Sequence, residues 1–172
     1  MDLQDELGIP RAASSKASLR LWLKLLKAQR RIEAKLRERL RQEFGSTLPR
    51  FDVLAALSST KQGLRMSELS GILKVSNGNV TGIVDRLVAD GYVERAPVEN
   101  DRRATRVCLT GAGEQHFDIL AAAHEGWLVA LLARFGGEAT ETLSRTLDKL
   151  NADLATGSDR ISERMDARTN GE

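Results

Sequence analysis

Apolar residues recur three or four positions apart through most of this chain, which is the spacing of one face of a helix. This spacing predicts helices over about 18–44, 48–57, 64–75, 76–90, 111–135 and 138–155. Glycine follows three of these stretches, at Gly45, Gly91 and Gly136, where the last turn of a helix favours a left-handed residue. The pattern therefore predicts a mainly α-helical protein.

Beyond the fourth of these helices the period of the pattern changes to two. Residues 92–95 and 105–109 alternate between apolar and polar types, which predicts the two strands of a half-buried hairpin. Residues 96–104 are polar and are expected to form a long loop with Arg102 and Arg103 at its tip. The fold class that follows is mainly α with a small β-wing.

The helix that begins at Ser76 has one apolar face and one polar face. Its apolar stripe consists of Val80, Ile83, Val84, Leu87 and Val88. The opposite face includes Gly78 and Gly82, and a glycine inside a helix costs about 1 kcal/mol relative to alanine. That cost is understandable where another molecule must come close to the helix. We expect this molecule to be DNA, with the base edges of its major groove against the polar face.

Two short helices joined by a turn, the second with a polar outer face, form the helix-turn-helix pattern, and a hairpin after them makes the unit winged. We expect DNA contacts from both parts. The residues are Ser76, Asn77, Gly78, Asn79, Thr81, Gly82 and Arg86 on the helix, and Asp101, Arg102 and Arg103 on the hairpin. Arg103 is expected to enter the minor groove, with Asp101 holding its guanidinium group, while Arg102 meets a phosphate.

Each of these assignments has a plainer alternative. The polar residues of the helix are also compatible with an ordinary solvated surface. For Arg86, an ion pair with Asp85, Asp90 or a neighbouring helix is the alternative to DNA contact.

Length and composition set broad limits on the protein. The chain has 172 residues, which predicts one domain or slightly more, and 41% of them are hydrophobic, enough for a core. The net charge of +2 says little about partners by itself. No apolar run approaches the roughly 20 residues of a membrane span, and no apolar stretch follows a basic start at the N-terminus. We therefore expect a cytoplasmic protein without a membrane partner.

The chain is expected to divide into five segments. These are a flexible N-terminal arm (1–17), an N-terminal dimerisation helix (18–47), a winged helix-turn-helix DNA-binding domain (48–110), C-terminal dimerisation helices (111–155) and a polar tail (156–172). The helices on either side of the winged unit are too long to bury their apolar stripes against it. Unburied stripes favour association, most commonly as a symmetric dimer. A dimer also suits DNA, because two recognition helices one helical turn apart read a palindrome.

From about Leu19 to Leu154 the chain resembles the MarR family of winged-helix transcriptional regulators. The resemblance rests on LPRFDVLAAL at 48–57, MSELSGILKVSNGNVTGIVDRLVADGYVER at 66–95 and NDRRATRVCLTGAGE at 100–114. Arg65 departs from the family pattern, since a Ser or Thr cap is common there, and this leaves the start of the next helix open. The resemblance implies a homodimer built from the terminal helices, DNA recognition by the helix from Ser76, and a ligand pocket between the dimer and winged regions.

A narrower likeness concerns the effector. SNGNVTG with LRLWLKLL at 19–26 is similar to the branch of the family that regulates aromatic-acid catabolism, whose inducer can be an aromatic acyl-CoA. The helix over 18–44 also carries more basic than acidic side chains, with Glu33 and Glu38 among the latter. We therefore expect an anionic aromatic effector that releases a repressor from DNA. Its expected contacts are Trp22, Arg30, Arg31, Lys35, His124 and Trp127.

The alternatives are a basic helix face that is simply solvated, a histidine at 124 that only packs, and a DNA-binding protein without an effector, architectural or regulated by abundance. An enzyme is not expected, because the chain has no Gly-rich phosphate loop, metal-binding helix or nucleophile elbow. Cys108 is the only cysteine and is expected to be structural, and His116 and His124 lack the further ligands of a metal site. No cofactor is expected.

Overall fold

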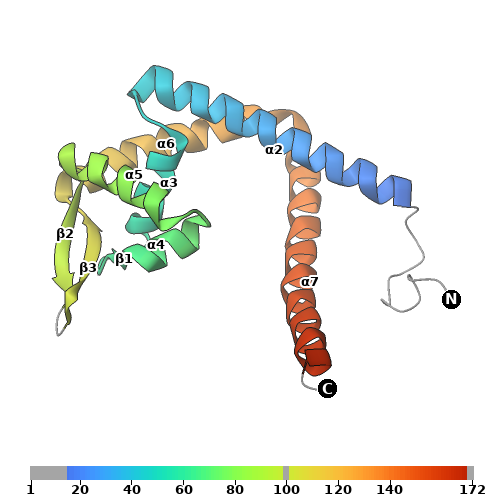
Figure 1. Cartoon of the computed structure of the whole chain (residues 1–172). Coiled ribbons are helices and arrows are strands. Elements are labelled where there is room, and N and C mark those ends of the chain that lie inside the picture. The colour runs from blue at the N-terminus through green and yellow to red at the C-terminus, as the bar shows by residue number, and fades with distance from the viewer. Residues whose placement is uncertain (1–14, 99–100, 170–172) are drawn as a thin grey trace. The chain divides into compact units, whose positions relative to one another are not determined.

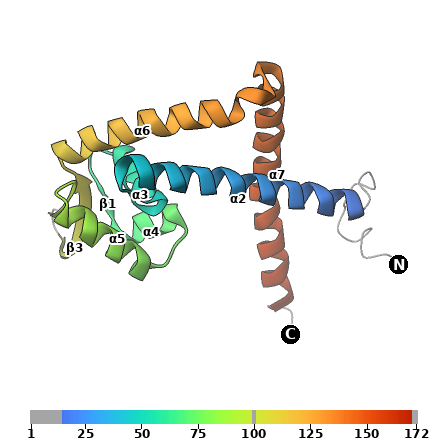
Figure 2. The same cartoon turned by 90° about the horizontal axis from the view of Figure 1, so that it is seen from above.

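The structure is a computed structural model that describes the backbone of residues 15–98 and 101–169 and the side chains of 16–97 and 105–156. Its elements are α2 (Ser15–Phe44), α3 (Leu48–Ser58), β1 (Leu64–Arg65), α4 (Met66–Leu73), α5 (Asn77–Ala89), β2 (Val93–Val98), β3 (Asp101–Leu109), α6 (Gly111–Leu132), a 3-10 turn η1 (Ala133–Phe135) and α7 (Gly137–Thr169). Figure 1 and Figure 2 show these elements from two directions. The predicted fold class, mainly α with a small β-wing, is confirmed.

The chain divides within α6 into two compact units, the first ending at Trp127 and the second beginning at Leu128. The first unit holds the hydrophobic core, which lies between α3, α4, α5, the strands and parts of α2 and α6. Its fully buried side chains are Leu40, Val53, Leu54, Leu57, Leu69, Val80, Val84, Leu87, Val93, Val107 and Leu120. Valine and leucine fill this core, as a chain with 4% aromatic residues requires.

The segment expected as one helix over 64–75 contains two elements instead. Leu64 and Arg65 form the short strand β1, which pairs antiparallel with Val107 and Arg106 of β3, so the sheet order is β1-β3-β2. The helix α4 begins only at Met66. The backbone N–H of Arg65, the residue before α4, donates to the Glu68 carboxylate at 2.7 Å. This is the glutamate half of a capping box, in which a Ser or Thr is common at the position that Arg65 occupies.

The hairpin is longer than expected. Residues 96–104 were predicted to be a loop, but β2 continues to Val98 and β3 begins at Asp101, with Val98 opposite Asp101. The register shifts between Pro97 and Val98, which marks a β-bulge. Residues 102–104 of β3 have no opposite residue on β2, and pairing resumes at Val98 and Asp101, so the β2–β3 ribbon extends from the helical core (Figure 1).

Two boundaries at the ends of the chain also differ from expectation. The helix α2 begins at Ser15, inside the segment expected to be a flexible arm. At the other end, α7 continues to Thr169, into the segment from residue 156 that was expected to be a polar tail. A helix needs no apolar stripe where its residues have a high intrinsic helix propensity, such as the Arg, Glu, Met and Ala residues of this segment.

Candidate nucleic-acid interface

The helix α5, which is expected to read DNA, starts and stops where the sequence indicates. Ser76 occupies the N-cap in an extended conformation, although its hydroxyl makes no capping hydrogen bond. At the other end Gly91 has a φ of +76°. The Gly91 N–H donates to the Val88 carbonyl and the Tyr92 N–H to the Leu87 carbonyl, both at 3.0 Å. This is a Schellman motif, which fixes the direction in which the chain leaves the helix.

The two faces of α5 have the burial that the sequence predicts. Val80, Val84 and Leu87 are fully buried, and Ile83 and Val88 pack against the same core. The other face is exposed along the whole helix and consists of Asn77, Gly78, Asn79, Thr81, Gly82, Asp85 and Arg86. The fold therefore presents a polar helical surface of the kind that enters a major groove.

The glycines of this face have no role in packing. A Cβ built on Gly78 or on Gly82 meets no neighbouring atom within 4 Å. Both residues lie inside a helix, so no left-handed conformation requires glycine there. At Gly82, in the helix interior, the protein accepts about 1 kcal/mol of helix propensity without a packing contact that requires glycine, and the close approach of a partner is a physical reason for this cost.

The ion pairs around α5 decide which charges are available. Asp85 accepts a hydrogen bond from Arg95 of β2 at 2.5 Å, and Asp90 pairs with Arg50 of α3. Asp85 and Asp90, the two carboxylates considered as partners of Arg86, therefore pair with other cations. Within the described residues the Arg86 side chain has neither a hydrogen bond nor an ion pair, so its guanidinium group is available to an external anion.

The Asp85–Arg95 pair joins α5 to β2 of the wing and was not anticipated. The two residues are ten positions apart on different elements, so no helical or strand periodicity relates them. Their side chains are 54% and 38% exposed, and such a surface pair contributes about 1 kcal/mol or less. Its value is geometric, since it sets the direction of the Arg95 side chain relative to the exposed face of α5.

Thr81 is also partly engaged within the helix. Its hydroxyl donates to the Asn77 carbonyl at 2.8 Å, which orients its methyl group.

The DNA contacts expected from the wing remain predictions, because the side chains of Asp101, Arg102 and Arg103 lie outside those that the structure describes. Their backbone belongs to the start of β3.

The residues expected to bind an effector lie in three different settings. Trp22, on the N-terminal half of α2, is 57% exposed. Arg30 and Arg31 line a shallow hollow on α2 together with Leu23, Leu26, Lys27 and Ala34. His124 and Trp127, by contrast, pack against the core of the first unit. Within the described part of a single chain, the six side chains therefore do not line a common cavity.

The aromatic neighbours of His124 and Trp127 are specific. His124 stacks on Phe51 with ring centroids 4.5 Å apart and an angle of 23°, and Trp127 lies 6.0 Å from Phe44 at 56°. Burial lowers the pKa of His124 below its usual value. These contacts support the packing alternative for His124.

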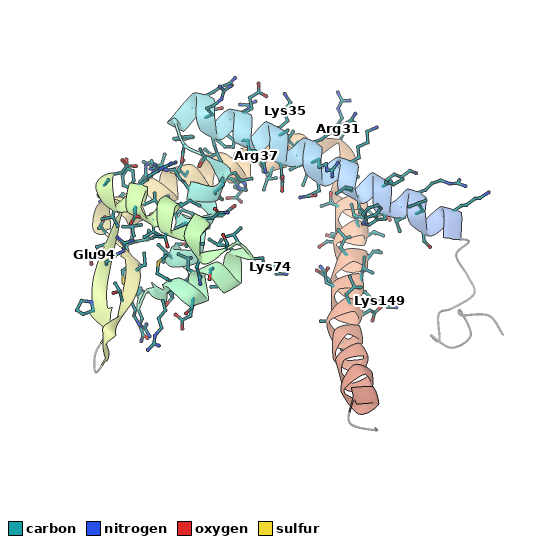
Figure 3. The ribbon with its side chains drawn as sticks, viewed as in Figure 1. Arg31, Lys35, Arg37, Lys74, Glu94 and Lys149 are labelled. Carbon is teal, nitrogen blue, oxygen red and sulfur yellow. The ribbon has the colours of Figure 1, made fainter. Side chains whose placement is uncertain are left out.

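Part of the positive charge of α2 is neutralised within the helix. Lys35 pairs with Glu38, Arg37 with Glu33 and Arg39 with Glu43, each at 3.0 Å. The hydrogen bond from Lys35 and its charge lower the pKa of the Glu38 carboxyl. Figure 3 shows the Arg31 and Lys35 side chains extending outward from α2. Of the expected effector cations, Arg30 and Arg31 carry no ion pair in the described part of the chain, whereas Lys35 does.

Comparison with known proteins identifies relatives for this arrangement. Residues 44–104 match the model of the MarR family. Over 79 residues, 45% of this chain, the sequence is 37% identical to the transcriptional activatory protein BadR of Rhodopseudomonas palustris, and it is 37% identical over 83 residues to the multiple antibiotic resistance protein MarR of Escherichia coli. These matches cover 45% and 56% of the two relatives, so the chain spans about half the length of the curated relatives it matches.

A solved structure gives the fuller match. The crystal structure of a MarR family transcriptional regulator from Silicibacter pomeroyi superposes with a TM-score of 0.71 at 33% identity, covering 83% of this chain and 99% of the other. The chain belongs to the MarR family. Its relatives are transcriptional regulators, in agreement with the prediction that the protein is not an enzyme. The likeness to the aromatic-acid branch of the MarR family remains a prediction.

Among the residues that the structure describes, the other candidate chemistry adds no second site. Cys108 is half-buried on β3, and its thiol lies 3.8 Å from the Gln62 carbonyl. In the described residues no group of three or more His, Cys, Asp and Glu side chains is placed to hold a metal ion. No single described helix is long and apolar enough to cross a membrane, and one bent pair, 111–135 with 137–156, reaches that threshold only when both members are counted together.

Proposed function

We propose that this protein binds double-stranded DNA sequence-specifically through the exposed face of α5 and regulates transcription. One observation carries the proposal: a continuous polar face with two glycines that the fold itself does not need. Arg86 adds an available cation to this face. Membership of a family of transcriptional regulators supports the same conclusion, and access to the chromosome implies a cytoplasmic location.

Selection of genomic DNA by the purified protein tests this proposal. Fragments retained on the immobilised full-length chain are sequenced, and a recovered motif is then titrated by fluorescence anisotropy at several salt concentrations. We expect specific binding about 10³-fold or more tighter than binding to unrelated DNA. Equal affinity for both would favour the alternative, an architectural protein that recognises the DNA backbone alone.

We further propose that the protein acts as a homodimer on a palindromic site. The N-terminal half of α2 leaves Leu19, Leu21, Trp22 and Leu23 between 48% and 58% exposed, and α7 exposes Leu143, Leu150 and Leu154. Such apolar surface on helices at both ends of the chain favours association with a second copy. Light scattering at micromolar concentration should give twice the 18.9 kDa mass of the chain, and a stable monomer would remove the argument for a palindrome.

The effector we propose is a small aromatic anion or its CoA thioester, which releases a repressor from DNA. Arg30 and Arg31 supply unpaired guanidinium groups beside an apolar hollow, and a planar guanidinium binds phosphate with two hydrogen bonds. A hundredfold release requires about 2.7 kcal/mol of coupling between the two sites. Aromatic acids and their thioesters are titrated into the protein–operator complex, and a thioester that binds the free protein without changing operator affinity would refute this role.

The sign of regulation is decided by where the operator lies. Repression is the proposal, whereas one relative carries the name of an activatory protein. A footprint that overlaps the promoter supports repression, and one upstream of it supports activation. An effector-independent regulator is the alternative if none of these ligands raises the melting temperature of the protein.

A further inference from the structure

The C-terminal end of the recognition helix is held by two other helices. Asp90 directly follows α5, and its carboxylate accepts a hydrogen bond from the guanidinium group of Arg50 on α3. Two residues later, the Tyr92 ring stacks on the His116 ring of α6, with centroids 4.1 Å apart and planes within 2° of parallel. These four side chains, Arg50, Asp90, Tyr92 and His116, are called the clasp below.

The backbone beneath the clasp is equally close. The Thr110 N–H donates to the Tyr92 carbonyl at 3.1 Å, and the Thr110 hydroxyl donates to the Gly91 carbonyl at 2.7 Å. Gly113, in the first turn of α6, approaches so closely that an added Cβ would lie 1.9 Å from the Tyr92 carbonyl oxygen. The start of α6 and the segment that follows α5 are therefore in direct backbone contact, without room for a side chain between them.

The His116 imidazole interacts with one positive and one negative group of the clasp. The charged groups facing it are Arg50 from α3 and Asp90 from the end of α5, while the Tyr92 ring covers its face. Arg50 is 21% exposed, and its Nε is buried without a hydrogen-bond partner in the described residues. The Asp90 carboxylate is thus the partner of the Arg50 guanidinium group, and a second cation nearby would compete with Arg50 for this carboxylate.

We propose that the clasp holds the recognition helix in its DNA-reading position and opens when His116 takes up a proton, so that acid weakens operator binding; the inference rests on the proposed DNA-binding function. Protonation gives the His116 ring a positive charge, which repels the Arg50 guanidinium and attracts the Asp90 carboxylate away from it. With Asp90 shared or withdrawn, the end of α5 loses its tie to α3.

The direction of the pH effect follows from the surroundings of His116. Burial and the charge of Arg50 lower the pKa of His116, and Asp90 opposes them to a smaller extent. A pKa that is lower with the clasp closed means that the closed form binds fewer protons. Its stabilisation is fully present above the ordinary histidine pKa of about 6.5 and is lost as pH falls through the lowered value.

The test compares pH profiles of operator binding by the full-length chain between pH 7.5 and 5.5 at constant ionic strength. His116→Phe keeps an aromatic ring against Tyr92 but takes up no proton. His124→Phe is the matched control, because His124 also stacks on an aromatic ring and also has a pKa lowered by burial. We expect the wild type and His124→Phe to lose about fivefold in affinity more than His116→Phe over this range.

Identical profiles for His116→Phe and the wild type would overturn the inference, as would a flat profile for His124→Phe alone.

The Arg50–Asp90 pair is tested by charge exchange at pH 7.5. Arg50→Glu and Asp90→Lys should each lower operator affinity about tenfold, and the double variant should restore it. Loss without restoration in a double variant that melts like the wild type would refute the positioning role. If the wild type selects no DNA at pH 7.5, the proposed function itself fails, whereas specific wild-type binding with unaffected variants removes only the clasp.

Discussion

Replacing Gly82 with leucine separates the stability of α5 from its function. The residue lies in the middle of the helix, and a Cβ there has no neighbour within 4 Å. Leucine is a better helix former than glycine, so the helix gains up to about 1 kcal/mol. The core is unaffected, because the stripe of Val80, Val84 and Leu87 points to the opposite side. The variant should therefore fold and melt a few degrees above the wild type.

Operator binding should change in the opposite direction. A leucine side chain on the exposed face holds the helix axis away from the base edges, and each good base contact contributes about 1–3 kcal/mol to discrimination. Loss of two such contacts costs about 2–6 kcal/mol, which corresponds to a complex that is at least about 30-fold weaker. Binding to unrelated DNA should weaken much less, since phosphate contacts dominate there.

Two control variants identify the cause. Gly82→Ala gives nearly the same gain in helix propensity with only one added carbon, so it should melt like Gly82→Leu and lose less than about tenfold in affinity. Gly126→Leu places the same side chain at another open helical position, on α6. Fluorescence anisotropy gives the affinity and calorimetry the melting temperature of each variant. Unchanged operator affinity in Gly82→Leu would mean that this face does not enter the groove.

Three further outcomes are expected. Arg103→Ala should weaken operator binding by about 1–3 kcal/mol if this residue reads a groove, whereas loss of a phosphate contact would lower the salt slope by about one unit instead. Gly113→Ala should destabilise the protein to urea by about 1–3 kcal/mol, because its methyl group overlaps a backbone carbonyl, while Gly111→Ala, with open space around its Cβ, should not. A double-mutant cycle on Asp85 and Arg95 should give a coupling of about 0.2–1 kcal/mol, and a larger value would show that the pair is shielded from solvent.

The sequence by itself determined the helix α5. Its apolar stripe, its N-cap at Ser76 and its left-handed residue at Gly91 depend on neighbours within a few positions, so the period of 3.6 residues and the local turn chemistry specify them. The exposed face follows from the same period once the buried face is known. Thr110 as the cap of α6 is a further local feature, since its hydroxyl accepts a hydrogen bond from the Gly113 N–H at 3.0 Å.

The tertiary structure decided what depends on residues far apart in the chain. Leu64 became a strand rather than the start of a helix because Val107, more than forty positions away, offers it a pairing partner. His124 belongs to the packing around Phe51, and no spacing in the sequence relates these residues. The Arg50–Asp90 pair and the Tyr92–His116 stack are of the same kind. Local periodicity fixes the face that an element presents, but only the folded chain fixes which charged and aromatic groups meet across elements.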